Sequence, residues 1–229
     1  MIFNPEFNLN CNLPLSEYPR PQFKRESYFC LNGLWDLKIV GESEVIFDGK
    51  INVPYSPETD LSGVSRQLKK GQTLIYSKTF TLPENFNQGV VLLNFGACDQ
   101  ETVVSINGKM VGENFGGYLP FTFDITKFLI DGENQLTVAV KDDADSDVYG
   151  RGKQTYKRGG IWYTATSGIW QSVFLESVPE NYIENIRIHP SEENVEIEVF
   201  TKAKYKKIPF LKFFDLLAPC VLIGQIIES

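Results

Sequence analysis

Alternation of apolar and polar residues with a period of two is the sequence feature that most restricts the fold. Segments 35–39 and 136–140 both show it, with apolar residues at every second position. Such a period places successive side chains on opposite faces of a strand, so each segment has one buried and one wet face. Further β-rich runs occupy 74–82, 90–95 and 173–178. No segment repeats the i, i+3, i+4 spacing of an amphipathic helix, so the sequence predicts an all-β protein.

The clearest turn signal is Asn107-Gly108, which lies between the β-rich runs 103–106 and 109–111. Asn-Gly supplies the two positive φ angles that a type I′ hairpin turn requires. Many short strands separated by such turns are typical of an antiparallel β-sandwich.

A domain boundary is expected near Pro179-Glu180-Asn181. Segments 182–190 and 195–199 again look like strands, and they would open a second β domain. A complete sandwich needs about 100 residues, more than the stretch from 182 to 229 supplies. From about Tyr205 the alternation is lost, and we expect a truncated or frame-shifted end there.

Composition excludes several classes of partner. The formal net charge is −7, which argues against nucleic acid and against an anionic membrane as partners, because both require a basic patch. An acidic surface suits a soluble protein that meets neutral ligands such as sugars. The longest apolar stretch, 208–227, is interrupted by Lys212, Asp215 and Pro219, so we do not expect it to be a membrane helix.

Cysteine usage points to a reducing compartment. The cysteines are Cys11, Cys30, Cys98 and Cys220. None of them forms a CxxC pair, and the N-terminus lacks the basic and apolar regions of a secretory signal. We therefore expect reduced thiols and a cytoplasmic location.

An ordered series of short motifs runs from about residue 28 to residue 178. They are Asn32-Gly33-Leu34-Trp35-Asp36, Val53-Pro54-Tyr55-Ser56-Pro57-Glu58, Tyr76-Ser77-Lys78-Thr79-Phe80, Phe95-Gly96-Ala97-Cys98-Asp99-Gln100, Asn107-Gly108-Lys109-Met110-Val111-Gly112, Gly117-Tyr118-Leu119-Pro120-Phe121 and Ser167-Gly168-Ile169-Trp170-Gln171. Each motif alone is weak, but their order resembles the N-terminal sugar-binding domain of glycoside hydrolase family 2, the β-galactosidase and β-glucuronidase family.

The resemblance implies an order of domains. A jelly-roll-like, galactose-binding-domain-like antiparallel β-sandwich would occupy 1–180, and a partial immunoglobulin-like β-sandwich would occupy 181–229. In the family a TIM barrel follows, with two glutamates that act in a retaining mechanism. This chain stops before that barrel, so the resemblance assigns it no catalytic residue and no organic cofactor. The missing barrel and a β-glycoside become its expected partners. Members of the family often form homo-oligomers, but the sequence does not decide the oligomeric state of the full enzyme.

The acidic loop that follows the strand at 136–140 is the main candidate site. In similar β-galactosidases an acidic residue from this region contacts sugar hydroxyls in the barrel, in some cases with a sodium ion. Asp142, Asp143 and Asp145 are the candidates, and a carboxylate suits the role because it accepts bonds from two hydroxyls. A solvated acidic turn is the alternative, and both interpretations stay open here.

The same loop carries the D-x-D-x-D spacing of a calcium loop at Asp143, Asp145 and Asp147. A calcium loop of this type needs Gly at its sixth position and Glu at its twelfth, where this chain has Val148 and Gln154. We therefore expect no metal site within the chain.

Aromatic side chains near the loop could stack on sugar rings. Tyr149, Trp162 and Tyr163 are candidate substrate-binding residues, because they lie in or beside a Gly-rich connection. Core packing is the alternative for all three, and it is the expected role of Trp35 and Trp170. The single histidine, His189, is expected to be structural, so a histidine-based triad or metal site is not expected.

Together these inferences predict a sugar-binding, active-site-completing module of a β-glycosidase that is inactive alone. Two alternatives come from other classes of protein. A free-standing carbohydrate-binding module would need an exposed aromatic platform and measurable affinity for sugar. A purely structural domain would only buttress the barrel, and sugars would not perturb it.

Overall fold

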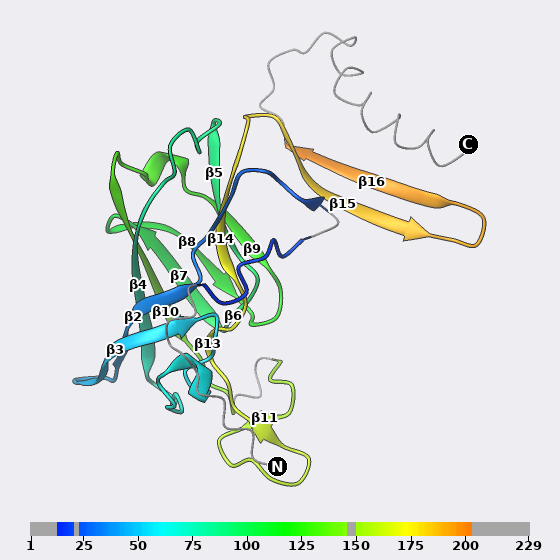
Figure 1. Cartoon of the computed structure of the whole chain (residues 1–229). Helices are drawn as coiled ribbons and strands as arrows, with labels where there is room; N and C mark the ends of the chain where they lie inside the picture. The colour runs from blue at the N-terminus through cyan, green and yellow to red at the C-terminus, as the bar shows by residue number, and fades with distance from the viewer. Residues whose placement is uncertain (1–12, 21–22, 146–149, 203–229) are drawn as a thin grey trace, which may run out of the picture. The chain divides into compact units, whose positions relative to one another are not determined.

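The computed structural model describes residues 13–20, 23–145 and 150–202. The chain divides into two compact units, Met1–Pro179 and Glu180–Ser229. Figure 1 shows the first unit as two sheets and the second as a hairpin. The expected domain boundary at 180/181 lies close to this division.

The larger sheet of the first unit has six strands in the order β3-β2-β4-β10-β7-β8. Its strands are β2 (Gly33–Val40), β3 (Val45–Val53), β4 (Thr73–Thr81), β7 (Glu101–Ile106), β8 (Lys109–Phe115) and β10 (Glu133–Lys141). Every neighbouring pair is antiparallel. In β2 and β10 every second residue is buried, so the alternation predicted for 35–39 and 136–140 is confirmed.

The smaller sheet has four strands in the order β1-β14-β5-β9. They are β1 (Tyr28–Cys30), β5 (Val90–Phe95), β9 (Phe121–Asp124) and β14 (Val173–Val178), again all antiparallel. Short elements lie in the connections: β6 (Cys98–Asp99) pairs with β13 (Gly168–Ile169), and β11 (Gln154–Thr155) pairs with β12 (Tyr163–Thr164). Two 3₁₀ turns occupy Asp60–Ser62 and Thr126–Phe128.

The hydrophobic core is formed by the facing sides of the two sheets. Fully buried contributors include Trp35, Leu37, Tyr76, Val138 and Ile106 from the larger sheet, with Leu93, Phe95, Val173 and Leu175 from the smaller one. Alternate residues of each strand supply this layer, which is the packing of a β-sandwich. The expected all-β sandwich is confirmed.

The predicted hairpin at Asn107-Gly108 is also confirmed. Both residues have positive φ, 52° and 74°, as a type I′ turn requires. The Asn107 side chain fixes the turn from outside: its Nδ2 donates to the carbonyl of Phe128 at 2.9 Å, and its Oδ1 accepts from the Gln135 amide at 2.9 Å.

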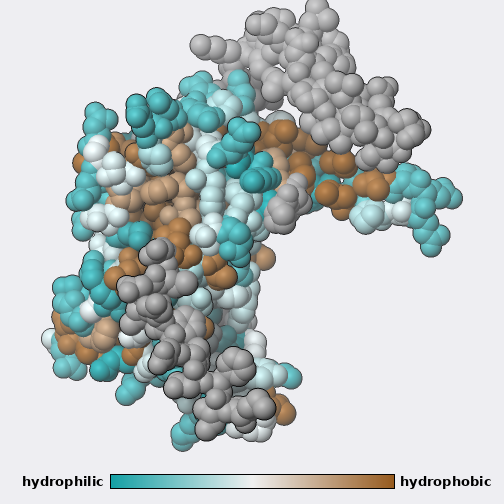
Figure 2. Space-filling view, viewed as in Figure 1, coloured by the Kyte–Doolittle hydropathy of each residue, from teal (hydrophilic) through white to brown (hydrophobic). Residues whose placement is uncertain are grey.

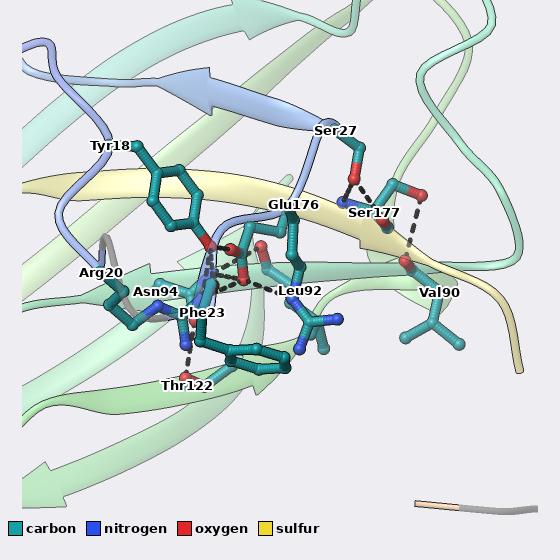
Figure 3. A network of polar contacts seen from close by, with 11 residues as sticks. Tyr18, Arg20, Phe23, Ser27, Val90, Leu92, Asn94, Thr122, Glu176 and Ser177 are labelled. Carbon is teal, nitrogen blue, oxygen red and sulfur yellow. Dashed lines mark hydrogen bonds and ion pairs between the residues drawn. The ribbon is translucent and has the colours of Figure 1, made fainter. Parts of the chain in front are cut away.

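The outer face of the smaller sheet is covered by the residues that precede β1. Figure 3 shows Glu176 of β14, which is fully buried, at the centre of this contact. Its carboxylate accepts from the Tyr18 hydroxyl and the Arg20 guanidinium, and Arg25 Nε lies 3.4 Å from Oε2. Asn94 of β5 donates to the same oxygen at 3.4 Å. A buried carboxylate requires such partners, and they attach Tyr18, Arg20 and Arg25 to the sheet.

The second unit is described over the antiparallel hairpin of β15 (Tyr182–Pro190) and β16 (Val195–Lys202). His189 lies on β15, exposed, with Nε2 3.8 Å from a Glu198 oxygen, and its structural role stays a prediction. The opening of an immunoglobulin-like sandwich by this hairpin stays a prediction. Among the described residues no helix is long and apolar enough to cross a membrane.

Candidate acidic site at the end of β10

Strand pairing brings the start of the acidic loop beside the start of β7. Lys141, the last residue of β10, is paired with Glu101, and the Gln100 amide donates to the Lys141 carbonyl at 3.3 Å. Asp142 therefore leaves the sheet next to the segment that contains Asp99. Both carboxyl groups are buried, with 8% of Asp142 and 6% of Asp99 exposed.

Within the part of the chain that the structure describes, neither carboxyl group has the partners that a buried charge normally needs. Asp99 Oδ1 is fully enclosed and accepts no hydrogen bond within the described part of the chain. Residue 117 must be glycine for this carboxyl group to fit, because a Cβ there would lie 2.1 Å from Asp99 Oδ1. For Asp142, too, no side-chain hydrogen bond is found among the described residues.

The electrostatic consequence is that both carboxyl groups hold their protons more tightly than usual. Burial raises the pKa of Asp142 to about 7, with further contributions from the negative charges of Asp99, Glu58 and Asp143. Burial also raises the pKa of Asp99 to about 6, with a smaller contribution from Glu58. Strongly perturbed groups of this kind concentrate at functional sites, because folding alone gives no reason to bury them unpaired.

Glu58 is a third carboxylate nearby, and it has a structural role. One oxygen accepts from the Ser167 hydroxyl at 2.7 Å and the Leu68 amide at 3.2 Å, while the other accepts from the Ser167 amide at 3.1 Å. The Ser56 hydroxyl donates to this second oxygen as well. These bonds join the loop at 54–68 to the loop before β13, so Glu58 positions the backbone around the site.

One wall of the site is aromatic. The Trp170 indole donates from Nε1 to the Gly117 carbonyl at 2.7 Å, and its ring meets Tyr118 edge-on, with centroids 6.3 Å apart. Trp170 is half-buried, so its expected place in the core is corrected. It lies just beyond the short strand β13, where its N–H can reach the Gly117 carbonyl while part of the ring stays accessible. Trp35, in contrast, is buried as predicted.

The connection at 150–166 carries the exposed aromatic residues. Trp162 is 41% exposed and Tyr163 is 65% exposed. The Arg151 guanidinium lies 5.5 Å from the Trp162 ring centroid, so it occupies one face of the indole. Gln154 holds the base of the connection, since its Oε1 accepts from the Thr166 amide at 2.6 Å. Tyr149 lies outside the described residues.

The other two candidate aspartates are paired with cations. Asp143 Oδ2 lies 2.7 Å from Lys70 Nζ, and Asp145 Oδ1 lies 3.8 Å from an Arg151 nitrogen. Asp145 also accepts from the Tyr156 amide at 3.3 Å, so it shapes its own loop. These pairings leave Asp142 as the candidate whose carboxyl group is not already used.

The described residues do not fit a metal centre. They contain no group of three or more His, Cys, Asp or Glu that could hold an ion. Two members of the calcium-loop spacing, Asp143 and Asp145, are engaged by Lys70 and Arg151, and Asp147 lies outside the described residues.

A shallow pocket opens beside Asp142, with a volume of about 220 Å³. Its lining residues are Lys70, Gly71, Gln72, Gln100, Glu101, Lys141, Asp142 and Asp143. All of these residues except Gly71 have polar or charged side chains, and hydroxyl-rich ligands match donors and acceptors of this kind.

Sequence reasoning did not single out Asp99, Gly117 or Tyr118 as parts of a site. Asp99 and Gly117 come together only through pairing between segments well separated in sequence. A weak signal was present for Asp99, a carboxylate that follows the mostly apolar segment 90–98. Carboxylates placed just after buried strands often belong to sites.

The comparisons with known proteins point to one family of glycosidases. The family model described as glycosyl hydrolases family 2, sugar binding domain, matches residues 31–179. A beta-galactosidase of Thermoanaerobacter pseudethanolicus is 30% identical over 113 residues, which cover 48% of this chain and 14% of that protein. A beta-glucuronidase of Formosa agariphila is 32% identical over 112 residues, covering 48% of this chain and 11% of that protein.

A solved structure is similar over more of the chain. The beta-glucuronidase of an uncultured Clostridium sp. is 26% identical, with a TM-score of 0.59, and the match covers 80% of this chain and 35% of that one. The chain thus spans only a minor part of the length of the relatives that it matches. Because the family model covers most of the chain, the chain belongs to glycoside hydrolase family 2, in which it matches the sugar-binding domain.

Proposed function

We propose that this chain supplies one wall of the active site of a β-glycosidase, with Asp142 as its contact to sugar hydroxyls. The observation that carries the proposal is the burial of Asp142 and Asp99, close enough for the charge of Asp99 to raise the pKa of Asp142 and without a cationic partner among the described residues. A bound sugar would supply the missing hydrogen-bond donors, because its hydroxyl groups can donate to both carboxyl groups when water is displaced.

The surrounding residues support a sugar rather than another ligand. Tyr118 and Trp170 offer apolar ring surface beside the two acids, and Trp162 and Tyr163 are exposed on the neighbouring connection. Flat aromatic surfaces and clustered hydrogen-bonding groups together suit the two kinds of face on a pyranose ring. A sodium ion in the full enzyme stays an expectation, and no step of the proposal depends on that ion.

The hydrolytic step itself is assigned to another domain. Family membership implies a barrel that carries the two catalytic carboxylates, and this chain would orient the sugar toward them. The missing barrel and a β-glycoside are therefore its proposed partners.

The test is a chimaera in which residues 1–179 replace the matching domain of the Thermoanaerobacter pseudethanolicus beta-galactosidase. In an active chimaera, Asp142→Ala should lower kcat/KM about ten- to a thousandfold, the loss of one or two charge-assisted hydrogen bonds of roughly 1.5–3 kcal/mol each. Asp143→Ala and Asp145→Ala are the matched controls and should stay within about threefold of the parent, because their carboxylates are held by Lys70 and Arg151.

Two other outcomes would favour the alternative functions. Three silent alanine variants would make the domain a buttress. Tight binding of free sugar by the isolated chain, lost on Trp162→Ala and retained on Asp142→Ala, would make it a free-standing carbohydrate-binding module.

A further inference from the structure

The hairpin of β15 and β16 has two different faces. The cross-strand pairs Ile186–Val199, Ile188–Ile197 and Pro190–Val195 share one face, because paired residues project to the same side of a sheet. The intervening pairs Arg187–Glu198 and His189–Glu196 share the other. The second face is a water-facing surface, on which Arg187 lies 3.6 Å from a Glu198 oxygen.

The apolar face is open in the described structure. Ile188, Val195 and Ile197 are 49%, 56% and 51% exposed. Figure 2 shows hydrophobic residues gathered along the hairpin beside its hydrophilic tip. Within the described residues β15 and β16 pair only with each other. A two-stranded hairpin is marginally stable in water, and a continuous apolar face of this kind marks a surface that another segment covers.

The chain itself contains a segment suited to this face. Residues 203–229 follow β16 directly, and the stretch 208–227 holds only two charged residues, Lys212 and Asp215. The five residues 203–207 can span up to roughly 17 Å, and the eight-residue strand β16 is about 27 Å long. The apolar stretch can therefore begin over the middle of the hairpin.

We propose that segment 208–227 packs against the apolar face formed by Ile186, Ile188, Val195, Ile197 and Val199. Burial of apolar area on both partners drives the contact. Both partners lie in the second unit of the chain, so the proposal is independent of the sugar site.

A cross-linking experiment on the full chain tests the proposal. Cys220 lies in the segment, and the matched variants Ile197→Cys and Glu196→Cys place a second thiol on opposite faces of the same strand. Both are made in a Cys11→Ser, Cys30→Ser background, where the remaining Cys98 is fully buried and has a pKa raised by burial to about 12. A short bis-maleimide is added, and the products are mapped by peptide mass spectrometry.

The expected result is an intramolecular cross-link between Cys220 and a cysteine at position 197. This link should form about tenfold faster than the link to position 196, because a thiol at position 196 projects from the opposite face of the hairpin, away from Cys220. Equal rates for the two variants, or no intramolecular link to position 197, would overturn the proposal. Cross-links only between chains would also overturn it and identify a second copy as the occupant.

A deletion after Lys202 provides a second measurement. If the segment covers the hairpin, amide hydrogen exchange in β15 and β16 should become about tenfold faster in the shortened chain, while exchange in β5 stays unchanged. Unchanged exchange in the hairpin would contradict the proposal.

Discussion

At the scale of single residues, the unusual feature is a pair of acids whose folded environment opposes their ionisation. An unfolded aspartate has a pKa of about 3.9, whereas Asp142 in the fold has a pKa of about 7. Between these values the native state binds more protons than the unfolded state, so this group makes stability fall as pH rises. Asp99 acts in the same direction up to a pH of about 6.

The first prediction follows from this decrease of stability with rising pH. Asp142→Asn should match the parent in stability at pH 4, where both side chains are neutral, and should exceed it by roughly 1–3 kcal/mol at pH 8. Denaturant unfolding at a series of pH values measures the difference directly. A difference that is constant with pH would show that Asp142 is not a strained acid.

The second prediction concerns the glycine that lies against Asp99. Gly117→Ala would place a Cβ 2.1 Å from Asp99 Oδ1, so the carboxyl group or the loop must move, at a cost of about 1–3 kcal/mol. Gly150→Ala is the matched control, because no atom lies within 4 Å of a Cβ there. Thermal unfolding, with carboxyl chemical shifts of Asp99, tests both. Equal stability of the two variants would argue against close packing of Asp99 on Gly117.

At the scale of secondary-structure elements, the sequence predicted strands well where one face is buried and the other wet. Segments 35–39 and 136–140 alternate because each belongs to such a strand. β3 was missed because it is an edge strand without regular alternation, and its Gly49 makes room for the ring of Phe47, which would lie 2.8 Å from a Cβ there.

The acidic loop was predicted for a different reason from the one that the structure supplies. The sequence indicated Asp142, Asp143 and Asp145 as equivalent candidates, and their spacing could not show which of them contacts the sugar. The distinction comes from pairing partners distant in the chain: Lys70 engages Asp143, whereas the pairing of β10 with β7 buries Asp142 near Asp99. Such long-range contacts leave no periodic signal in one sequence.

The third prediction belongs to the contact of Tyr18, Arg20 and Arg25 with the smaller sheet. Glu176→Ala should cost roughly 3 kcal/mol, because it leaves Arg20 and Arg25 without their buried partner. Glu198→Ala removes an exposed partner of Arg187 and should change stability by less than about 0.5 kcal/mol. Denaturant midpoints compare the two. Similar small losses would mean that this contact contributes little to the fold.

At the scale of the whole molecule, each of the two units carries an exposed feature of its own. The acidic site occupies the strand ends of the first unit, and the apolar hairpin face belongs to the second. The hydrophobic core accounts for the stability of the fold but does not indicate a function. The features that the core does not require, the unpaired acids and the exposed aromatic connection, are the ones that support a role in sugar binding.

The last prediction is that the isolated chain hydrolyses no chromogenic β-galactoside or β-glucuronide above background. Retaining chemistry needs two carboxyl groups about 5 Å apart, one ionised as nucleophile and one protonated as acid, on either side of the glycosidic bond. Asp99 and Asp142 do not divide into these roles, because burial raises the pKa of both. Only Asp142 of the two lines the pocket, so the described residues do not place the two carboxyl groups on either side of a bound glycosidic bond. The assay compares the purified chain with its Asp142→Asn variant between pH 4 and pH 8. Turnover that copurifies with the chain and disappears in the variant would show that the acidic pair itself performs hydrolysis.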